Sequence, residues 1–136
     1  MSRLASFVAK SLLFLPIVIF ALSCGSNRQL QTVTISPKAA DAKTFPNGHV
    51  PFSATGTFSK APSPAPLTSQ NIGWCIGSTS GICDPAEPTY PSVDQNGVAQ
   101  CGPFVGTATV LAGTGASGVS DAAVFTIFGS AQLTCP

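Results

Sequence analysis

Apolar and polar residues alternate along most of this chain, and a repeat of two is typical of β-strands. In residues 32–36, for example, Val33 and Ile35 fall on one face, between threonine and serine on the other. A helical repeat is not found in the body of the chain. The pattern predicts short strands at residues 32–36, 50–58, 72–76, 98–101, 107–112 and 122–128, with a strand end at 93–94.

Turn-forming residues separate these strands. Asn47-Gly48 and Asn96-Gly97 predict tight turns, because both residue types adopt a positive φ at low cost. Gly56 predicts a bulge or a close approach of another segment. Residues 59–69 contain three alternating prolines, so they are expected to form neither a helix nor a central strand. We interpret them as a surface loop rather than as a proline-rich ligand of another protein.

Short strands at this spacing predict an all-β fold, a β-sandwich of about seven short antiparallel strands. An open barrel is the alternative. Trp74 is the only tryptophan, and we expect it to anchor the core rather than to serve as a ligand platform. The strand at 122–128 is expected to close the sandwich, with Phe125 and Ile127 facing inward. The sandwich then spans residues 32–129, and residues 130–136 form a C-terminal tail that includes Cys135.

The N-terminus has the three parts of a secretory signal peptide. Arg3 and Lys10 give it a positive charge, residues 11–22 form an apolar run, and small residues precede Cys24. These features predict a signal peptide over residues 1–23. A membrane-spanning helix is the alternative, but a span needs ~20 apolar residues. The run here is shorter and contains a proline.

Residues 21–25 (ALSCG) also resemble the lipobox of bacterial lipoproteins. In that family the cysteine becomes the first mature residue, and it is acylated on its sulfur (as with palmitate) and on its amino group. The resemblance implies a lipid anchor at Cys24. Because Gly25 rather than Asp follows, it also implies the outer membrane, if the host has one. Residues 24–31 would then form the lipidated cysteine and a polar tether, whereas pairing of Cys24 with another cysteine is the alternative.

The chain has five cysteines, and four remain if Cys24 carries lipid. An even number after an export signal suggests disulfides. A zinc site is the alternative, but the CxxC spacing and the histidine partners of such a site are missing. The disulfide candidates are Cys75, Cys83, Cys101 and Cys135.

Charge excludes one class of partner. Charged residues make up only 8% of the chain, and the formal net charge is +1. No lysine or arginine follows Lys60. A protein that binds nucleic acid needs a basic surface, so we expect no nucleic-acid partner.

No catalytic motif is recognised in the sequence, so we expect no enzyme, no cofactor and no metal. His49 is the only histidine, and its neighbours Gly48 and Pro51 indicate a turn or a strand edge. A cleft with convergent polar groups around His49 would favour an enzyme instead. The acids Asp84, Glu87 and Asp94 could approach one another around calcium, but dispersed surface acids are the more common arrangement.

The order of the segments resembles the bacterial immunoglobulin-like domains of group 2. Members of that family show a first strand like TVTISP, then a phrase like FSATGTF and a strand with a tryptophan. A VD-x-NG-V turn, a GTATV strand and a closing strand rich in Ala, Val and Thr follow. The resemblance implies an immunoglobulin-like sandwich, although the cysteine-containing loop after Trp74 and the tail depart from the family. The corresponding segments here are residues 32–37, 52–58, 74, 93–98, 106–110 and 122–127.

The resemblance also bears on the cysteines. In such a sandwich the strand of Trp74 lies antiparallel to the strand that starts near Cys101, and that strand lies antiparallel to the last one. The four cysteines would then gather at one pole. Four cysteines allow three connectivities, and a Cys75–Cys135 bond is disfavoured because a strand lies between the two residues. The arrangement favours Cys75–Cys83 together with Cys101–Cys135.

The expected function follows from the anchor and the fold. We expect a non-catalytic, lipid-anchored protein of the cell envelope that is attached to the membrane through Cys24. It would bind a surface protein or a glycan through its sheet edges and loops. The alternative is a structural envelope lipoprotein without a specific ligand.

Overall fold

The computed structural model describes residues 28–84, 91–114 and 124–136, and these residues form an all-β sandwich. The predicted fold class is confirmed, but the described residues contain ten strands rather than about seven. One reason is that the expected strand at 50–58 is two strands, which pair in different sheets. The chain changes sheet at Phe52, whose N–H donates to the carbonyl of Gly97 at 2.9 Å.

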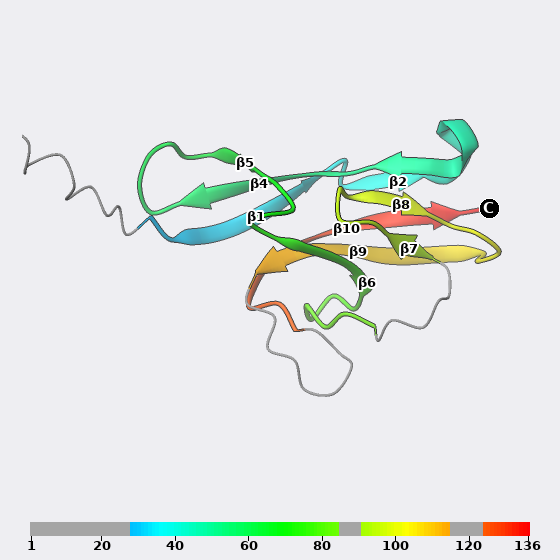
Figure 1. The fold of residues 1–136 in the computed structure, drawn as a ribbon. Coiled ribbons are helices and arrows are strands. Elements are labelled where there is room, and N and C mark those ends of the chain that lie inside the picture. Colours follow the sequence, from blue (N-terminus) through cyan, green and yellow to red (C-terminus); the bar gives the residue numbers. More distant parts are fainter. Residues whose placement is uncertain (1–27, 85–90, 115–123) are drawn as a thin grey trace, which may run out of the picture.

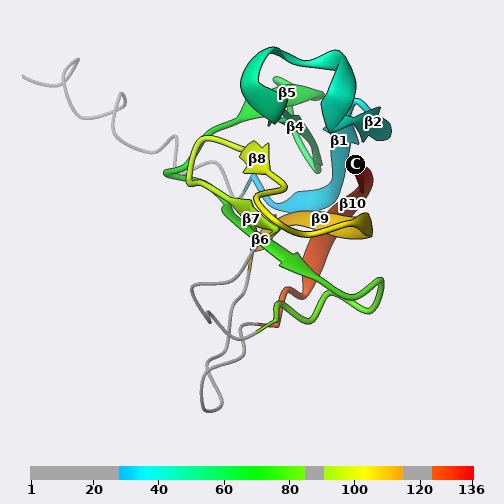
Figure 2. The same ribbon diagram turned by 90° about the vertical axis from the view of Figure 1, so that its right-hand side faces the viewer.

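The strands form three sheets (Figure 1). Viewed along the strands, two of them face each other across the core, and the third, smaller sheet lies at the side (Figure 2). The first has the order β1-β4-β5, the second β2-β10-β9-β6 and the third β3-β8-β7. Their bounds are β1 (Leu30–Ser36), β2 (Ala39–Asp41), β3 (His49–Pro51), β4 (Ser53–Phe58), β5 (Ala65–Leu67), β6 (Gly73–Gly77), β7 (Ser92–Val93), β8 (Val98–Gln100), β9 (Gly106–Thr114) and β10 (Ile127–Cys135).

The order of the central strands follows the resemblance. β6 pairs antiparallel with β9, and β9 pairs antiparallel with β10. The expectation of an entirely antiparallel fold is wrong, however, because β2 runs parallel to β10 at the edge of the same sheet. The proline-rich segment is a loop except at β5, which is an edge strand, so the exclusion of a central strand holds.

The core is built from the alternating positions of all three sheets, and the third sheet contributes the fully buried Val50 of β3 and Ala99 of β8. Ile35 of β1, Val110 of β9 and Leu133 of β10 are fully buried in it. Trp74 is half-buried and packs against this core. Its ring also covers the turn at Gly97, where a Cβ atom would lie 2.8 Å from the ring carbon Cζ2. The expected anchoring role of Trp74 therefore agrees with its packing.

Glycine allows two close approaches in the sandwich. A Cβ atom at Gly56 would lie 2.5 Å from Cδ1 of Leu30, so the prediction of a close approach at Gly56 is confirmed. At Gly129, a Cβ atom would lie 2.6 Å from the carbonyl oxygen of Val33. Glycine at position 129 thus lets β1 pass close to β10.

The end of the chain differs from the prediction. Residues 130–136 are not a tail, because β10 runs to Cys135 and is paired with β9 along its whole length. Ala131, Leu133 and Cys135 alternate into the core, with polar residues between them. Phe125 is buried, but it precedes the strand and belongs to a separate small cluster with Leu111. Residues 122 and 123 of the expected closing strand lie outside the described residues.

The expected signal peptide and Cys24 also lie outside the described residues. The last residues of the expected tether belong to the folded domain, because Leu30 begins β1 and its side chain packs against the core. Across the part of the chain that the structure describes, none of the helices has the length and apolarity needed to cross a membrane.

Candidate functional site

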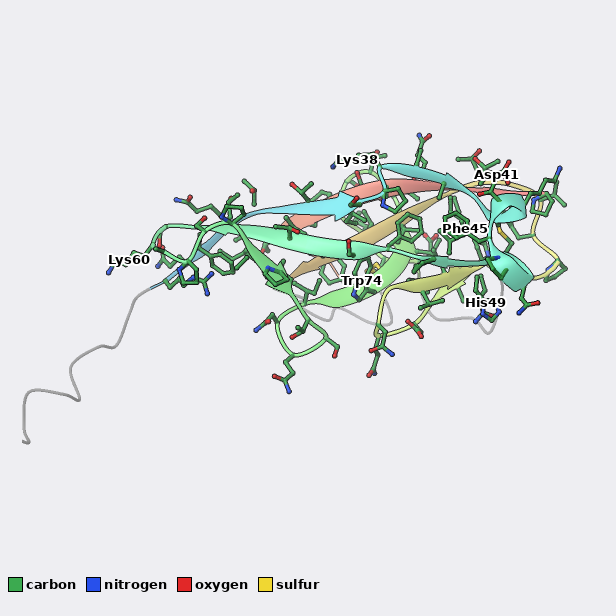
Figure 3. The ribbon with its side chains drawn as sticks, turned by 90° about the horizontal axis from the view of Figure 1, so that it is seen from above. Lys38, Asp41, Phe45, His49, Lys60 and Trp74 are labelled. Carbon is green, nitrogen blue, oxygen red and sulfur yellow. A yellow bond between two sulfur atoms is a disulfide. The ribbon has the colours of Figure 1, made fainter. Side chains whose placement is uncertain are left out.

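The two ends of the sandwich differ in what they carry. Asp41, Phe45 and His49 lie at one end of the molecule, and Lys60 lies at the other (Figure 3). Arg28, the first described residue, lies at the Lys60 end, since its ring contact and its hydrogen bond are both with the segment 58–62. The chain therefore enters the fold at the end opposite His49.

A depression of about 420 Å³ lies at the His49 end, and we call it the distal depression. Its lining residues include Phe45, Asn47, His49 and Gln100. His49 and Gln100 are partners in the pairing of β3 with β8, so the sheet itself fixes their spacing. The side chain of His49 is exposed, whereas Phe45 is half-buried and packs against the core.

Local sequence explains why the chain folds this way between β2 and β3. Asp41 starts a 3₁₀ turn, and its Oδ1 accepts a hydrogen bond from the backbone N–H of Lys43 at 2.9 Å. A second 3₁₀ turn follows, in which Asn47 and Gly48 adopt φ values of 56° and 68°. This confirms the turn predicted there. Positive φ at two successive residues reverses the chain sharply, which brings His49 back beside Phe45.

The chemistry of the distal depression is that of polar recognition. An amide at Asn47, another at Gln100 and the imidazole of His49 can each donate and accept hydrogen bonds, and they stand beside the aromatic ring of Phe45. Sites for small ligands combine an apolar or aromatic surface with a few placed polar groups. The sequence pointed to His49 only as a turn or strand-edge residue, and it is the first residue of the edge strand β3.

Phe45 and Gln100 were not expected at a site. Phe45 lies in a segment that reads as mixed and polar, and Gln100 is one residue of a short strand. The available signal was the Asn47-Gly48 turn, which joins two residues that line the same depression, Phe45 and His49. Gln100 could be found only from the pairing of β3 with β8, which joins residues distant in sequence.

Two disulfides join the four cysteines, Cys75 to Cys83 and Cys101 to Cys135, with Cα–Cα distances of 5.7 and 5.6 Å. These are the pairs that the resemblance favours. Disulfides form and persist in oxidising compartments, which indicates an exported protein. The Cys101–Cys135 bond borders the distal depression, since Cys101 is one of its lining residues.

The expectation that all four cysteines gather at one pole is wrong. Cys135 pairs in register with Gly106 at the end of the sheet, whereas Cys75 pairs with Leu111, five residues further along β9. Cys75 also faces away from the main core, because adjacent residues of a strand point to opposite faces and Trp74 faces the core. Cys75 and Cys83 therefore pack against Leu111 on the outer face of the sheet.

The acids considered as calcium ligands do not form a cation site in the described part of the chain, where no group of three or more metal-ligating side chains is found. Glu87 lies outside the described residues. Asp94 has a structural role: its Oδ1 accepts hydrogen bonds from the backbone N–H groups of Asn96 and Val98, both at 2.8 Å. These bonds hold the Asn96-Gly97 turn, where Gly97 has a φ of 81°.

Comparison with known proteins gives no relative from which a site could be transferred. None of the models of known protein families matches the chain. Searches among curated proteins and among solved structures found no match either.

Proposed function

We propose that this protein is a lipid-anchored, non-catalytic component of the bacterial cell envelope that binds a surface ligand at the distal depression. The observation that carries the proposal is the position of that depression at the end of the sandwich opposite the point where the chain enters it. The lipobox-like sequence at Cys24 supports the anchor, and the resemblance to bacterial immunoglobulin-like domains of group 2 supports a binding module.

An anchor at Cys24 would turn the distal depression away from the membrane. β9 and β10 each have nine residues, and such strands are ~30 Å long. A sandwich of that length, attached at one end, presents its other end to the space beyond the lipid surface. The Cys101–Cys135 bond supports this role, because it holds the connection between β8 and β9 to the end of β10 beside the depression.

The size of the distal depression favours a glycan over a folded protein as the ligand. A stable protein–protein interface buries about 800 Å² on each partner. A depression of about 420 Å³ lies instead in the range of small-molecule sites, which is about 300–1,000 Å³. Hydroxyl groups of a sugar would meet the amides of Asn47 and Gln100 and the imidazole of His49.

The anchor is tested by the intact mass of the protein purified from its native membrane. We expect the mass of a chain that starts at Cys24 with acyl groups attached. We also expect four thiols that react with a label only after reduction. A chain without lipid would refute the anchor.

Ligand binding is tested on an array of bacterial cell-surface oligosaccharides with three proteins. Lost hydrogen bonds cost about 0.5–1.5 kcal/mol each, so we expect the double variant His49→Ala/Gln100→Ala to bind about tenfold more weakly than the unchanged protein. The matched control is Gln132→Ala, because Gln132 is exposed on β10. If neither the array nor crosslinking on intact cells yields a reproducible ligand, the alternative of a structural envelope lipoprotein is favoured.

A further inference from the structure

The start of the described chain is fixed to the loop between β4 and β5, residues 59–64. The guanidinium of Arg28 stacks on the ring of Phe58, with its Cζ 3.5 Å from the ring centroid. The same guanidinium donates a hydrogen bond to the carbonyl oxygen of Pro62. Gln29 and Ser59 exchange two further bonds: the N–H of Gln29 donates to the Ser59 hydroxyl at 3.0 Å, and the N–H of Ser59 donates to the Gln29 carbonyl at 2.9 Å.

These contacts shorten the link between the fold and the expected lipid anchor. The polar segment before β1 reads as a tether that extends to residue 31, but the fold already holds the chain at Arg28. Only four residue steps then separate Arg28 from Cys24, and four extended residues span at most about 14 Å. The headgroup layer of a bilayer is itself about 5–7 Å thick on each side. The backbone at Arg28 thus remains within about 10 Å of the headgroups, which is close to the Debye length of about 8–10 Å at 0.15–0.1 M ionic strength.

The loop is suited to meet a lipid surface. It presents the exposed side chain of Lys60 at the end of the molecule (Figure 3). Pro62 and Pro64 restrict its backbone, and the hydroxyl of Ser63 accepts a hydrogen bond from the N–H of Phe58 at 2.8 Å. The loop therefore holds Lys60 in a defined place, and the acidic side chain of Asp41 lies at the opposite end.

We propose that the β4–β5 loop is a membrane-contact surface, which Arg28 positions and which places Lys60 against acidic lipid headgroups. The proposal rests on the proposed lipid anchor at Cys24. It assigns a role to the proline-rich segment and fixes the orientation of the sandwich. Arg28 is a positioning residue in this arrangement, because its guanidinium is already engaged by Phe58 and Pro62.

The test uses lysine reactivity, because a chain that starts at Cys24 has only three lysines, Lys38, Lys43 and Lys60. The lipidated protein is placed in vesicles of phosphatidylcholine alone or of phosphatidylcholine with phosphatidylglycerol. It is acetylated briefly with an N-hydroxysuccinimide ester, and each site is quantified by mass spectrometry. We expect Lys60 to react about fivefold more slowly on the anionic vesicles than on the neutral ones, the effect of one basic residue beside an acidic surface. Lys43 is the internal control and reacts equally on both, and high salt removes the difference at Lys60.

Two variants test the positioning by Arg28 and the short link. In one, a flexible Gly-Ser spacer is inserted between Gly25 and Ser26, which precede the described residues. In the other, Arg28→Ala removes the contacts of the guanidinium with Phe58 and Pro62, and Gln31→Ala, at an exposed position of β1, is its matched control. We expect the spacer to restore most of the reactivity of Lys60. Arg28→Ala should restore only a smaller part, because the two Gln29–Ser59 bonds remain, and Gln31→Ala should leave the reactivity unchanged.

The outcomes separate this proposal from the anchor on which it rests. A protein that does not float with the vesicles refutes the anchor, and the loop contact with it. A protein that floats, but whose Lys60 reacts equally fast on neutral and anionic vesicles, refutes the loop contact alone. If Lys60 still reacts more slowly on anionic vesicles after the spacer is inserted, the short link does not position the loop at the membrane.

Discussion

The two disulfides are expected to contribute unequally to stability, because they close loops of different length. Cys101 and Cys135 are 34 residues apart in sequence, whereas Cys75 and Cys83 are 8 apart. A disulfide restricts the unfolded chain more strongly as the closed loop grows. We therefore compare the free energies of unfolding of two double variants, Cys101→Ala/Cys135→Ala and Cys75→Ala/Cys83→Ala.

The loop lengths set the magnitudes. The loop-entropy relation gives about 4 kcal/mol for the Cys101–Cys135 bond and about 2.5 kcal/mol for the Cys75–Cys83 bond at 25 °C. Packing acts in the same direction: Cys101 and Cys135 are both buried in the main core, whereas Cys75 is only half-buried. The entropic difference alone is about 1.3 kcal/mol, so we expect the first double variant to lose at least about 1.3 kcal/mol more than the second.

Urea unfolding of the oxidised proteins measures this difference. The fluorescence of Trp74 and far-UV circular dichroism are followed together, and coincident transitions with unchanged m-values establish that the two-state comparison is sound. An equal loss in the two variants, or a larger loss from the Cys75–Cys83 pair, would refute the loop-closure argument.

Two further predictions concern the turn under Trp74 and the core. Gly97→Ala should cost about 1–3 kcal/mol more than Gly48→Ala. Both glycines have positive φ, but only at Gly97 would the new Cβ meet a backbone oxygen at 2.6 Å and the ring of Trp74. If chemical unfolding shows an equal loss of unfolding free energy in the two variants, the ring does not constrain the turn. Leu133→Ala should cost about 2–5 kcal/mol, because Leu133 is fully buried. Val105→Ala, at a position 74% exposed, should change the free energy of unfolding by no more than about 0.5 kcal/mol. Similar melting temperatures for Leu133→Ala and Val105→Ala would contradict the assignment of β10 to the core.

The local pattern was sufficient for the fold class and for much of the secondary structure. Val33 and Ile35 are buried as their alternation predicts, and the turn at Asn47-Gly48 forms where both residues tolerate positive φ. These features depend on neighbouring residues alone, so a sequence contains them directly. The same reasoning was available for β10, where Leu133 and Cys135 alternate with polar residues, but residues 130–136 were predicted to be a tail. The glycine at position 129 is explained by β1, which passes within contact distance of it.

Pairing between distant segments decided the arrangement of the sheets and the position of the distal depression. Apolar and polar residues alternate without a break through residues 50–58, but the segment divides between two sheets. The division occurs because the N–H of Phe52 donates a hydrogen bond to the carbonyl of Gly97. The distal depression exists because β3 pairs with β8, and the chain is held at Arg28 because its guanidinium contacts Phe58 and Pro62.

By itself, then, the sequence determined an all-β chain with its main turns, four cysteines between residues 75 and 135, and an N-terminus typical of export. These depend on composition, local periodicity and spacing. Tertiary structure alone decided which strands share a sheet, which face each disulfide occupies and which end of the sandwich carries His49. The physical reason is that each of these depends on hydrogen bonds and packing between residues far apart in the chain, and many pairings are compatible with one pattern of alternation.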